Sequence, residues 1–266
     1  MFNLSKPLFA VALTGIASAA SAVVPFEVRY ESEAPGIQLT TATFNYGGVE
    51  TFTSLNTGTG QTYDSNFGTS GAGTTVSGHY TVLQVNNADQ YGGADGIGKY
   101  AVTFTTAGYG VDLSTDATNG INYFGYWLSA LDSGNQVSFY HAGTKLFTFS
   151  PSDVINAVNA TATRDQYYTN PNANFAGQNN QPYIFLNFFA PQGITFDRVE
   201  FSENPLGGGY ESDNHTVGNF LTKGTGTKVP LFDSVVPEPA TWAMMIAGFG
   251  FVGVASRRRK SSTVAA

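Results

Sequence analysis

The 266-residue sequence contains no cysteine and few charged residues. Without cysteine the chain can form neither disulfides nor thiolate metal centres, so its stability has to come from burial and backbone hydrogen bonding. Charged residues make up 12% of the sequence, against about a quarter in an average domain. Glycine, threonine, asparagine and aromatic residues are plentiful instead, and this composition favours strands and turns. We therefore expect an extracellular β-protein.

Basic residues are scarce between Val23 and Val236, where seven of them face eighteen acidic ones, a net charge of −11. Nucleic acid and anionic lipid both require a positive surface, so neither is expected as a partner. Divalent cations and neutral polymers remain open as ligands.

The first 22 residues have the organisation of a signal peptide. Lys6 precedes an apolar run from Pro7, and Ala20 and Ala22 are small residues at the positions that signal peptidase reads. We expect signal peptidase to cleave after Ala22. An uncleaved membrane anchor is the alternative interpretation, although the run is short and weakly apolar.

The other end carries a second apolar run, Trp242 to Ala255, which four consecutive cations follow at 257–260. A helix of this length reaches about 21 Å, less than the roughly 30 Å hydrocarbon core. It is a marginal transmembrane helix whose cations stay on the cytoplasmic side, with residues 261–266 as a cytoplasmic tail. We expect transient anchoring in the inner membrane, with everything upstream exported.

The order of features around this run resembles the PEP-CTERM sorting signal, in its PEPxxWA variant, over 236–260. The matching residues are Pro237, Glu238, Pro239, Trp242, Ala243, Arg257, Arg258 and Arg259. The resemblance implies processing by an exosortase, a membrane cysteine transpeptidase that cuts near Pro-Glu-Pro and passes the chain outward. A generic C-terminal anchor is the alternative.

The region between the two ends predicts an all-β domain. The expected strands, separated by glycine-rich turns, cover 24–30, 37–46, 49–55, 80–85, 99–105, 121–131, 137–140, 145–149, 183–189, 194–201 and 210–217. Residues 56–75 are too poor in apolar side chains to pack and predict a surface loop. Pro151 to Val158 predicts a short helix. We expect one antiparallel β-sandwich over 23–217, jelly-roll-like, and a flexible linker over 218–235.

Three segments of this domain resemble a family of exosortase-dependent surface proteins. They are Gln90 to Ala94, Ile121 to Asp132 and Gly209 to Asn214. The last of them is also similar to the closing strand of carbohydrate-binding sandwiches. These resemblances imply location and fold, and they imply no catalytic activity.

Glu211 and Asp213 are the first candidate site residues. They are two apart on a predicted strand, so both carboxylates project from one face about 6 to 7 Å apart. Two like charges this close favour a bound cation. Together with Asn214 they are similar to the position at which carbohydrate-binding sandwiches hold calcium, where Glu27 or Glu31 would complete the ligand set. A solvated acidic face is the alternative.

A polysaccharide hydrolase would use the same carboxylates differently. Lectin-like β-glucanases carry Glu-x-Asp-x-x-Glu on one strand, whereas here Thr216 stands where the second glutamate is needed. A retaining mechanism would then have to take Glu200 or Glu203 as its second carboxylate. We expect no enzyme on this pattern.

Other candidate groups are dispersed. Exposed aromatic side chains can stack on sugar rings, and the candidates beside predicted loops are Tyr91, Tyr109, Tyr167 and Tyr168. The three histidines, at 79, 141 and 215, have no zinc-binding spacing. Asp89 and Asp95 in a glycine-rich stretch are a weaker second cation candidate.

These observations favour a non-enzymatic protein of the cell surface or extracellular matrix, processed by exosortase. It would be adhesive or structural in the exopolysaccharide layer of a biofilm, and calcium-dependent glycan binding is one form of this role. The alternatives are the hydrolase acting through Glu211 and Asp213, and a structural coat protein without a ligand.

Overall fold

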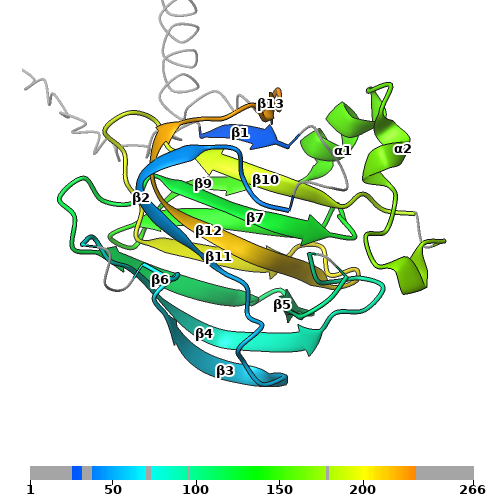
Figure 1. The fold of residues 1–266 in the computed structure, drawn as a ribbon, viewed down its shortest axis with the longest axis horizontal. Helices are drawn as coiled ribbons and strands as arrows, with labels where there is room; N and C mark the ends of the chain where they lie inside the picture. Colours follow the sequence, from blue (N-terminus) through cyan, green and yellow to red (C-terminus); the bar gives the residue numbers. More distant parts are fainter. Residues whose placement is uncertain (1–25, 32–37, 70–72, 95, 178–179, 232–266) are drawn as a thin grey trace, which may run out of the picture. The chain divides into compact units, whose positions relative to one another are not determined.

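The computed structural model describes residues 26–31, 38–69, 73–94, 96–177 and 180–231, which belong to one compact unit, Val23–Phe232 (Figure 1). The predicted signal peptide with Ala20 and Ala22, and the predicted sorting sequence with its membrane helix, lie outside these residues. No helix within the described ranges is long and apolar enough to cross a membrane.

The described residues form a predominantly β domain, as predicted. Its strands are β1 Glu27–Tyr30, β2 Thr43–Glu50, β3 Gly58–Ser65, β4 Val76–Asn87, β5 Lys99–Thr103, β6 Tyr109–Thr115, β7 Tyr123–Ser129, β8 Asn135–His141, β9 Thr144–Phe149, β10 Ile184–Phe189, β11 Arg198–Glu203, β12 Tyr210–Thr222 and β13 Thr227–Lys228. Two short helices, α1 Ser152–Asn159 and α2 Arg164–Tyr167, and a 3₁₀ turn, Ala173–Phe175, lie between β9 and β10. The helix predicted from Pro151 is α1, and its Val154 and Val158 are buried.

All these strands join in one antiparallel sheet, in the order β13-β1-β10-β7-β12-β5-β4-β6-β11-β8-β9, with β2 beside β12 and β3 beside β4 (Figure 1). The long strand β4 connects the two halves of this sheet. Its first part pairs with β6 up to Thr81, and its second part pairs with β5 from Gln84. Between them Val82 has a positive φ of 59°, and such an irregularity lets a strand bend from one layer to the next.

The bend brings the two halves face to face, as aromatic contacts between distant strands demonstrate. Phe124 of β7 lies 5.9 Å from Phe201 of β11, and Phe188 of β10 lies 5.2 Å from Phe149 of β9. These rings belong to one large core cluster. The antiparallel all-β prediction is therefore confirmed, with the two layers continuous through β4.

One loop and one turn predicted from the sequence contain strand residues in the structure. The loop expected over 56–75 contains β3, which pairs with β4, and its Phe67 is buried. Gly47-Gly48, expected as a turn, continues β2 alongside β12. A Cβ on Gly48 would collide with the carbonyl oxygen of Phe67, so glycine here permits close backbone packing.

The domain boundary is also wrong in the sequence-based prediction. Residues 218–222 are the end of β12, and Thr227–Lys228 pairs with β1 as β13. Val229 is buried, and its amide donates to the carbonyl oxygen of Val28. The glycine and threonine content of this segment therefore reflects an edge strand and its turn, and residues 218–229 belong to the domain. Strand β6 lies between two predicted strands and was not predicted from the sequence.

Substitutions at two glycines with positive φ can test how strongly close backbone packing restricts the side chain. Gly108 has φ +66°, and a Cβ there would collide with the carbonyl oxygen of Phe201, whereas Gly143 has φ +77° and open space around it. We expect Gly143→Ala to lower the free energy of unfolding by about 1 kcal/mol through backbone strain alone. Gly108→Ala should lower it by about 3 kcal/mol or more, because the backbone must also move.

Urea unfolding of both variants beside the unchanged protein measures the two values. Equal destabilisation by both substitutions would contradict the close approach at Gly108.

Candidate functional site

Glu211 and Asp213 lie on one face of β12, as predicted, but that face is covered. Glu211 is opposite Ser129 of β7, and Asp213 is opposite Trp127. Only 5% of Glu211 and 4% of Asp213 are exposed. The same face carries a small apolar cluster of Ala94, Trp127, Tyr183 and Phe185, in which residues from two loops cover the sheet. The alternative prediction of a solvated acidic face at this position is therefore wrong.

The oxygens of Asp213 are already hydrogen-bonded. Its Oδ2 accepts from the amide of Ala94 at 2.9 Å, and its Oδ1 accepts from the amide of Asn214 at 2.7 Å. Asn214 lies at an irregularity of β12 with φ 49°, and its Nδ2 donates to the carbonyl oxygen of Gln38. The three residues are adjacent, yet the side chain of Asn214 is held by a different neighbour.

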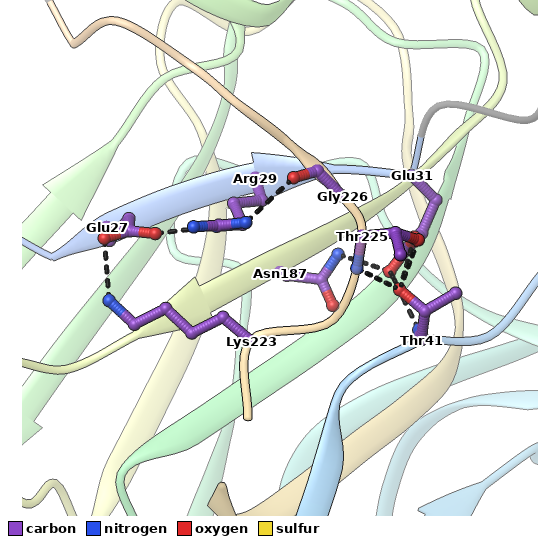
Figure 2. Close-up of polar contacts among 8 residues, drawn as sticks. All are labelled: Glu27, Arg29, Glu31, Thr41, Asn187, Lys223, Thr225 and Gly226. Carbon is purple, nitrogen blue, oxygen red and sulfur yellow. Dashed lines mark hydrogen bonds and ion pairs between the residues drawn. The ribbon is translucent and has the colours of Figure 1, made fainter. Parts of the chain in front are cut away.

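Glu27 and Glu31, the expected additional ligands, are engaged elsewhere (Figure 2). Glu27 accepts from Arg29 at 2.6 Å and from Lys223 at 2.7 Å. Glu31 is buried, and its carboxylate accepts from the amide and hydroxyl of Thr41 and from Nδ2 of Asn187. Both carboxylates thus tie the first strand to later segments. Among the residues that the structure describes, no three His, Asp or Glu side chains are grouped closely enough to hold a metal ion by themselves.

Glu211 has a strongly altered acidity. Burial raises its pKa to about 8, and the carboxylates of Asp89, Asp132 and Glu203 act in the same direction. A carboxyl with this pKa is mostly protonated at neutral pH, so it is a neutral hydrogen-bonding group in the folded domain.

The remaining hydrolase candidates, Glu200 and Glu203, lie on β11. Glu200 is half-buried and accepts from Arg198 at 2.8 Å, and this ion pair contributes to lowering the pKa of Glu200 although burial opposes it. Glu203 is buried on the opposite face of the same strand, where its Oε1 accepts from the amide of Gly208.

His215 is a residue whose role the sequence did not reveal. Its ring is fully buried at the centre of the core, 5.0 Å from Phe201 in a stacked arrangement. Nδ1 pairs with the hydroxyl of Tyr80 at 3.1 Å, and Nε2 pairs with that of Ser212 at 3.0 Å. Burial lowers the pKa of His215 to about 3, so the ring is neutral. The serine–histidine pair is structural, because no substrate can reach it.

Of the four aromatic side chains considered for sugar stacking, only one is exposed. Tyr91 is 49% exposed, whereas Tyr109, Tyr167 and Tyr168 are buried. Asp89 accepts from the amides of Tyr91 and Gly92, so it shapes its own loop. Asp95 lies outside the described residues.

The exposed surface contains a groove that the sequence did not predict. It has a volume of about 430 Å³ and lies over β3, β4 and β6. Its polar side chains come from every second residue of those strands and include Asp64, Ser77, His79, Asp112 and Ser114. A smaller groove of about 240 Å³ shares Leu113 and Ser114 with it and extends to His141 and Asp197.

Strand register aligns the charges beside this groove in one row. Asp64 is opposite His79, His79 is opposite Asp112, and Asp112 is opposite Arg198 of β11. His79 Nδ1 lies 2.6 Å from Asp64, and Arg198 Nη1 lies 2.5 Å from Asp112. The guanidinium of Arg198 lies flat over Gly110, where a side chain would displace it. These two ion pairs hold the row in place and leave carboxylate oxygens of Asp64 and Asp112 exposed to solvent.

The pKa of Glu211 predicts a specific pH dependence of stability. Because the folded carboxyl keeps its proton up to about pH 8 and the unfolded one loses it near pH 4.5, unfolding releases a proton between these values. The free energy of unfolding therefore loses up to about 1.4 kcal/mol per pH unit as pH rises through this window. Glu211→Gln should remove this loss, so that the variant gains stability relative to the unchanged protein from pH 4.5 to 8.

Urea unfolding at several pH values in metal-free buffer measures this difference. Asp165→Asn, on an exposed side chain of α2, is the control and should give a difference that does not grow across the window. A constant difference for Glu211→Gln would show that its carboxyl is ionised in the folded domain.

Comparison with known proteins identifies one feature of the chain. Nothing among curated proteins or solved structures matches the chain. Residues 235–260 match the PEP-CTERM protein-sorting motif, which includes the residues Pro237 to Pro239, Trp242, Ala243 and Arg257 to Arg259 from the sequence analysis. This motif implies processing by exosortase, export, and a final location at the cell surface or outside the cell. The chain therefore carries a PEP-CTERM sorting motif at its C-terminal end, at residues 235–260.

Proposed function

We propose that the domain is a non-enzymatic, adhesive or structural component of the exopolysaccharide layer. The observation that carries this proposal is the sorting motif at 235–260, which directs the chain outward. In this proposal the short C-terminal helix anchors the chain in the inner membrane until exosortase removes it, and the β domain remains in the matrix. The same proposal includes a jelly-roll-like arrangement of the domain, similar to that of carbohydrate-binding sandwiches.

The groove over β3, β4 and β6 is the surface that we assign to glycan contact. Serine hydroxyls and aspartate oxygens are the groups that hydrogen-bond to sugar hydroxyls, and both are present there in Ser77, Ser114 and Asp64. The carboxylates of the groove would repel a polymer of uronic acids. Neutral sugars and amino sugars are therefore the ligand classes that fit it.

The burial of Glu211 and Asp213 supports the non-enzymatic form of the proposal. A retaining glycosidase places two carboxyl groups on either side of a bond of the bound polymer. Neither side chain has the exposure that such contact requires. A calcium-dependent form of glycan binding, with the ion near Glu211, Asp213 and Asn214, remains within the proposal.

Binding to the host's own exopolysaccharide tests the proposal. The full-length chain, purified in detergent, is titrated against the isolated polymer in calcium and, separately, in chelator. We expect saturable binding, weakened about tenfold by Asp64→Ala, because a hydrogen bond to a charged group contributes about 1.5 kcal/mol.

Asp165→Ala removes the same charge from an exposed position away from the groove and should bind like the unchanged chain. Absence of binding in both conditions would leave a structural coat protein, and equal binding by the Asp64 variant would move glycan contact to another surface.

A further inference from the structure

Two buried polar side chains at one end of the core lack hydrogen-bond partners. Asn135, at the start of β8, is 0% exposed, and neither its Nδ2 nor its Oδ1 has a partner. Glu203, at the end of β11, is 1% exposed, and its Oε2 has none. Each buried polar group without a partner costs about 1 to 3 kcal/mol, so two together require an explanation.

These two side chains face each other. Asn135 and Glu203 are direct partners in the antiparallel register of β8 and β11, so they project from the same face. Directly opposed residues have Cβ atoms about 4.5 to 5.5 Å apart. Asn135 directly follows loop 130–134, and Glu203 directly precedes loop 204–209.

A second carboxylate, that of Asp132, lies beside the same glycine as Glu203. The amide of Gly208 donates to Glu203 Oε1 at 3.2 Å, and a Cβ on Gly208 would lie 2.7 Å from Asp132 Oδ2. Gly208 thus lies between the carboxylates of Asp132 and Glu203. The loops are joined here as well, because the amide of Asn204 donates to the carbonyl oxygen of Gly134.

The charges in this region are of one sign. The ion pairs found among the described residues include neither Asp132, Glu203 nor Glu211. An amide oxygen on the strand register partner of one carboxylate, with a second carboxylate beside the same loop, is a ligand set that suits a hard cation.

We propose that Asp132, Asn135 and Glu203 bind a divalent cation, calcium, between the β7–β8 and β11–β12 loops. Calcium accepts carboxylate, carboxamide and backbone carbonyl oxygens in irregular arrangements, whereas magnesium requires a near-octahedral set and retains several waters. The ion would satisfy Oδ1 of Asn135 and Oε2 of Glu203 and hold the two loops together. Its ligands differ from Glu211, Asp213 and Asn214, and binding of the ion requires no glycan.

Calcium titration of the full-length chain tests this site directly. Chain purified in detergent and freed of metal is titrated with CaCl₂ by calorimetry, and its thermal unfolding is followed in CaCl₂, MgCl₂ and EDTA. We expect one saturable site with a dissociation constant on the order of 10⁻⁵ to 10⁻³ M. Calcium should raise the unfolding temperature more than magnesium does.

Two variants and two controls locate the ion. Glu203→Gln and Asn135→Leu should each weaken calcium binding at least about tenfold, since each removes a ligand oxygen or its charge. Glu200→Gln, on the same strand but the opposite face, should bind like the unchanged chain. If one ligand variant does not fold, the other decides.

Absence of saturable calcium binding would overturn the proposal and leave an ordered water between Asn135 and Glu203. Unchanged binding in the folded ligand variants would overturn it too. Loss of binding in Asp213→Asn alone would place the ion at the site predicted from the sequence. Because no polysaccharide is present, none of these results depends on the glycan-binding proposal.

Discussion

The structure depends on the bend of one long strand. β4 pairs with β6 before Val82 and with β5 after it, so a single hydrogen-bonded sheet becomes two layers that face each other. A chain without cysteine needs this geometry, because enclosing aromatic side chains between two layers is its main source of stability. Aromatic rings from β7 and β10 meet rings from β9 and β11 across the gap that the bend closes.

The same closure determines the chemical character of the buried polar residues. β12 has neighbours on both sides, and both of its faces are covered, so polar residues on it become interior groups. Asp213 accepts two backbone amides, Glu211 favours its neutral form, and His215 remains uncharged among aromatic rings. The residues that suggested a metal or catalytic site on an exposed strand are therefore interior groups. Their hydrogen bonds satisfy buried polar atoms and help to specify one packing of the core.

Function has to be sought on surfaces and at the ends of the sheet. The outer face of β3, β4 and β6 offers exposed carboxylates and hydroxyls above a groove, while the loops near Asn135 and Glu203 enclose polar atoms without partners. The first feature suits a polymer and the second suits an ion. The sorting motif directs the domain that carries both features to the outside of the cell.

The sequence by itself determined where the protein goes and which class of fold it adopts. The sorting motif is a linear pattern that needs no tertiary contact to be recognised. Short apolar runs reveal strands such as β7 and β10, which are buried along their whole length. Glycine content, however, has two opposite meanings. In Gly47-Gly48 and in 218–229 it allows close strand pairing, yet by composition alone it predicts a turn or a tether.

Only the tertiary structure decided what the candidate residues do. Spacing correctly predicted that Glu211 and Asp213 share a face, because side-chain alternation is a local property of a strand. Whether that face is exposed depends on loops that are distant in the chain, as the hydrogen bond from Ala94 to Asp213, 119 residues later, illustrates. The pairing of Asn135 with Glu203 and the row from Asp64 to Arg198 likewise arise from strand order, which local sequence does not encode.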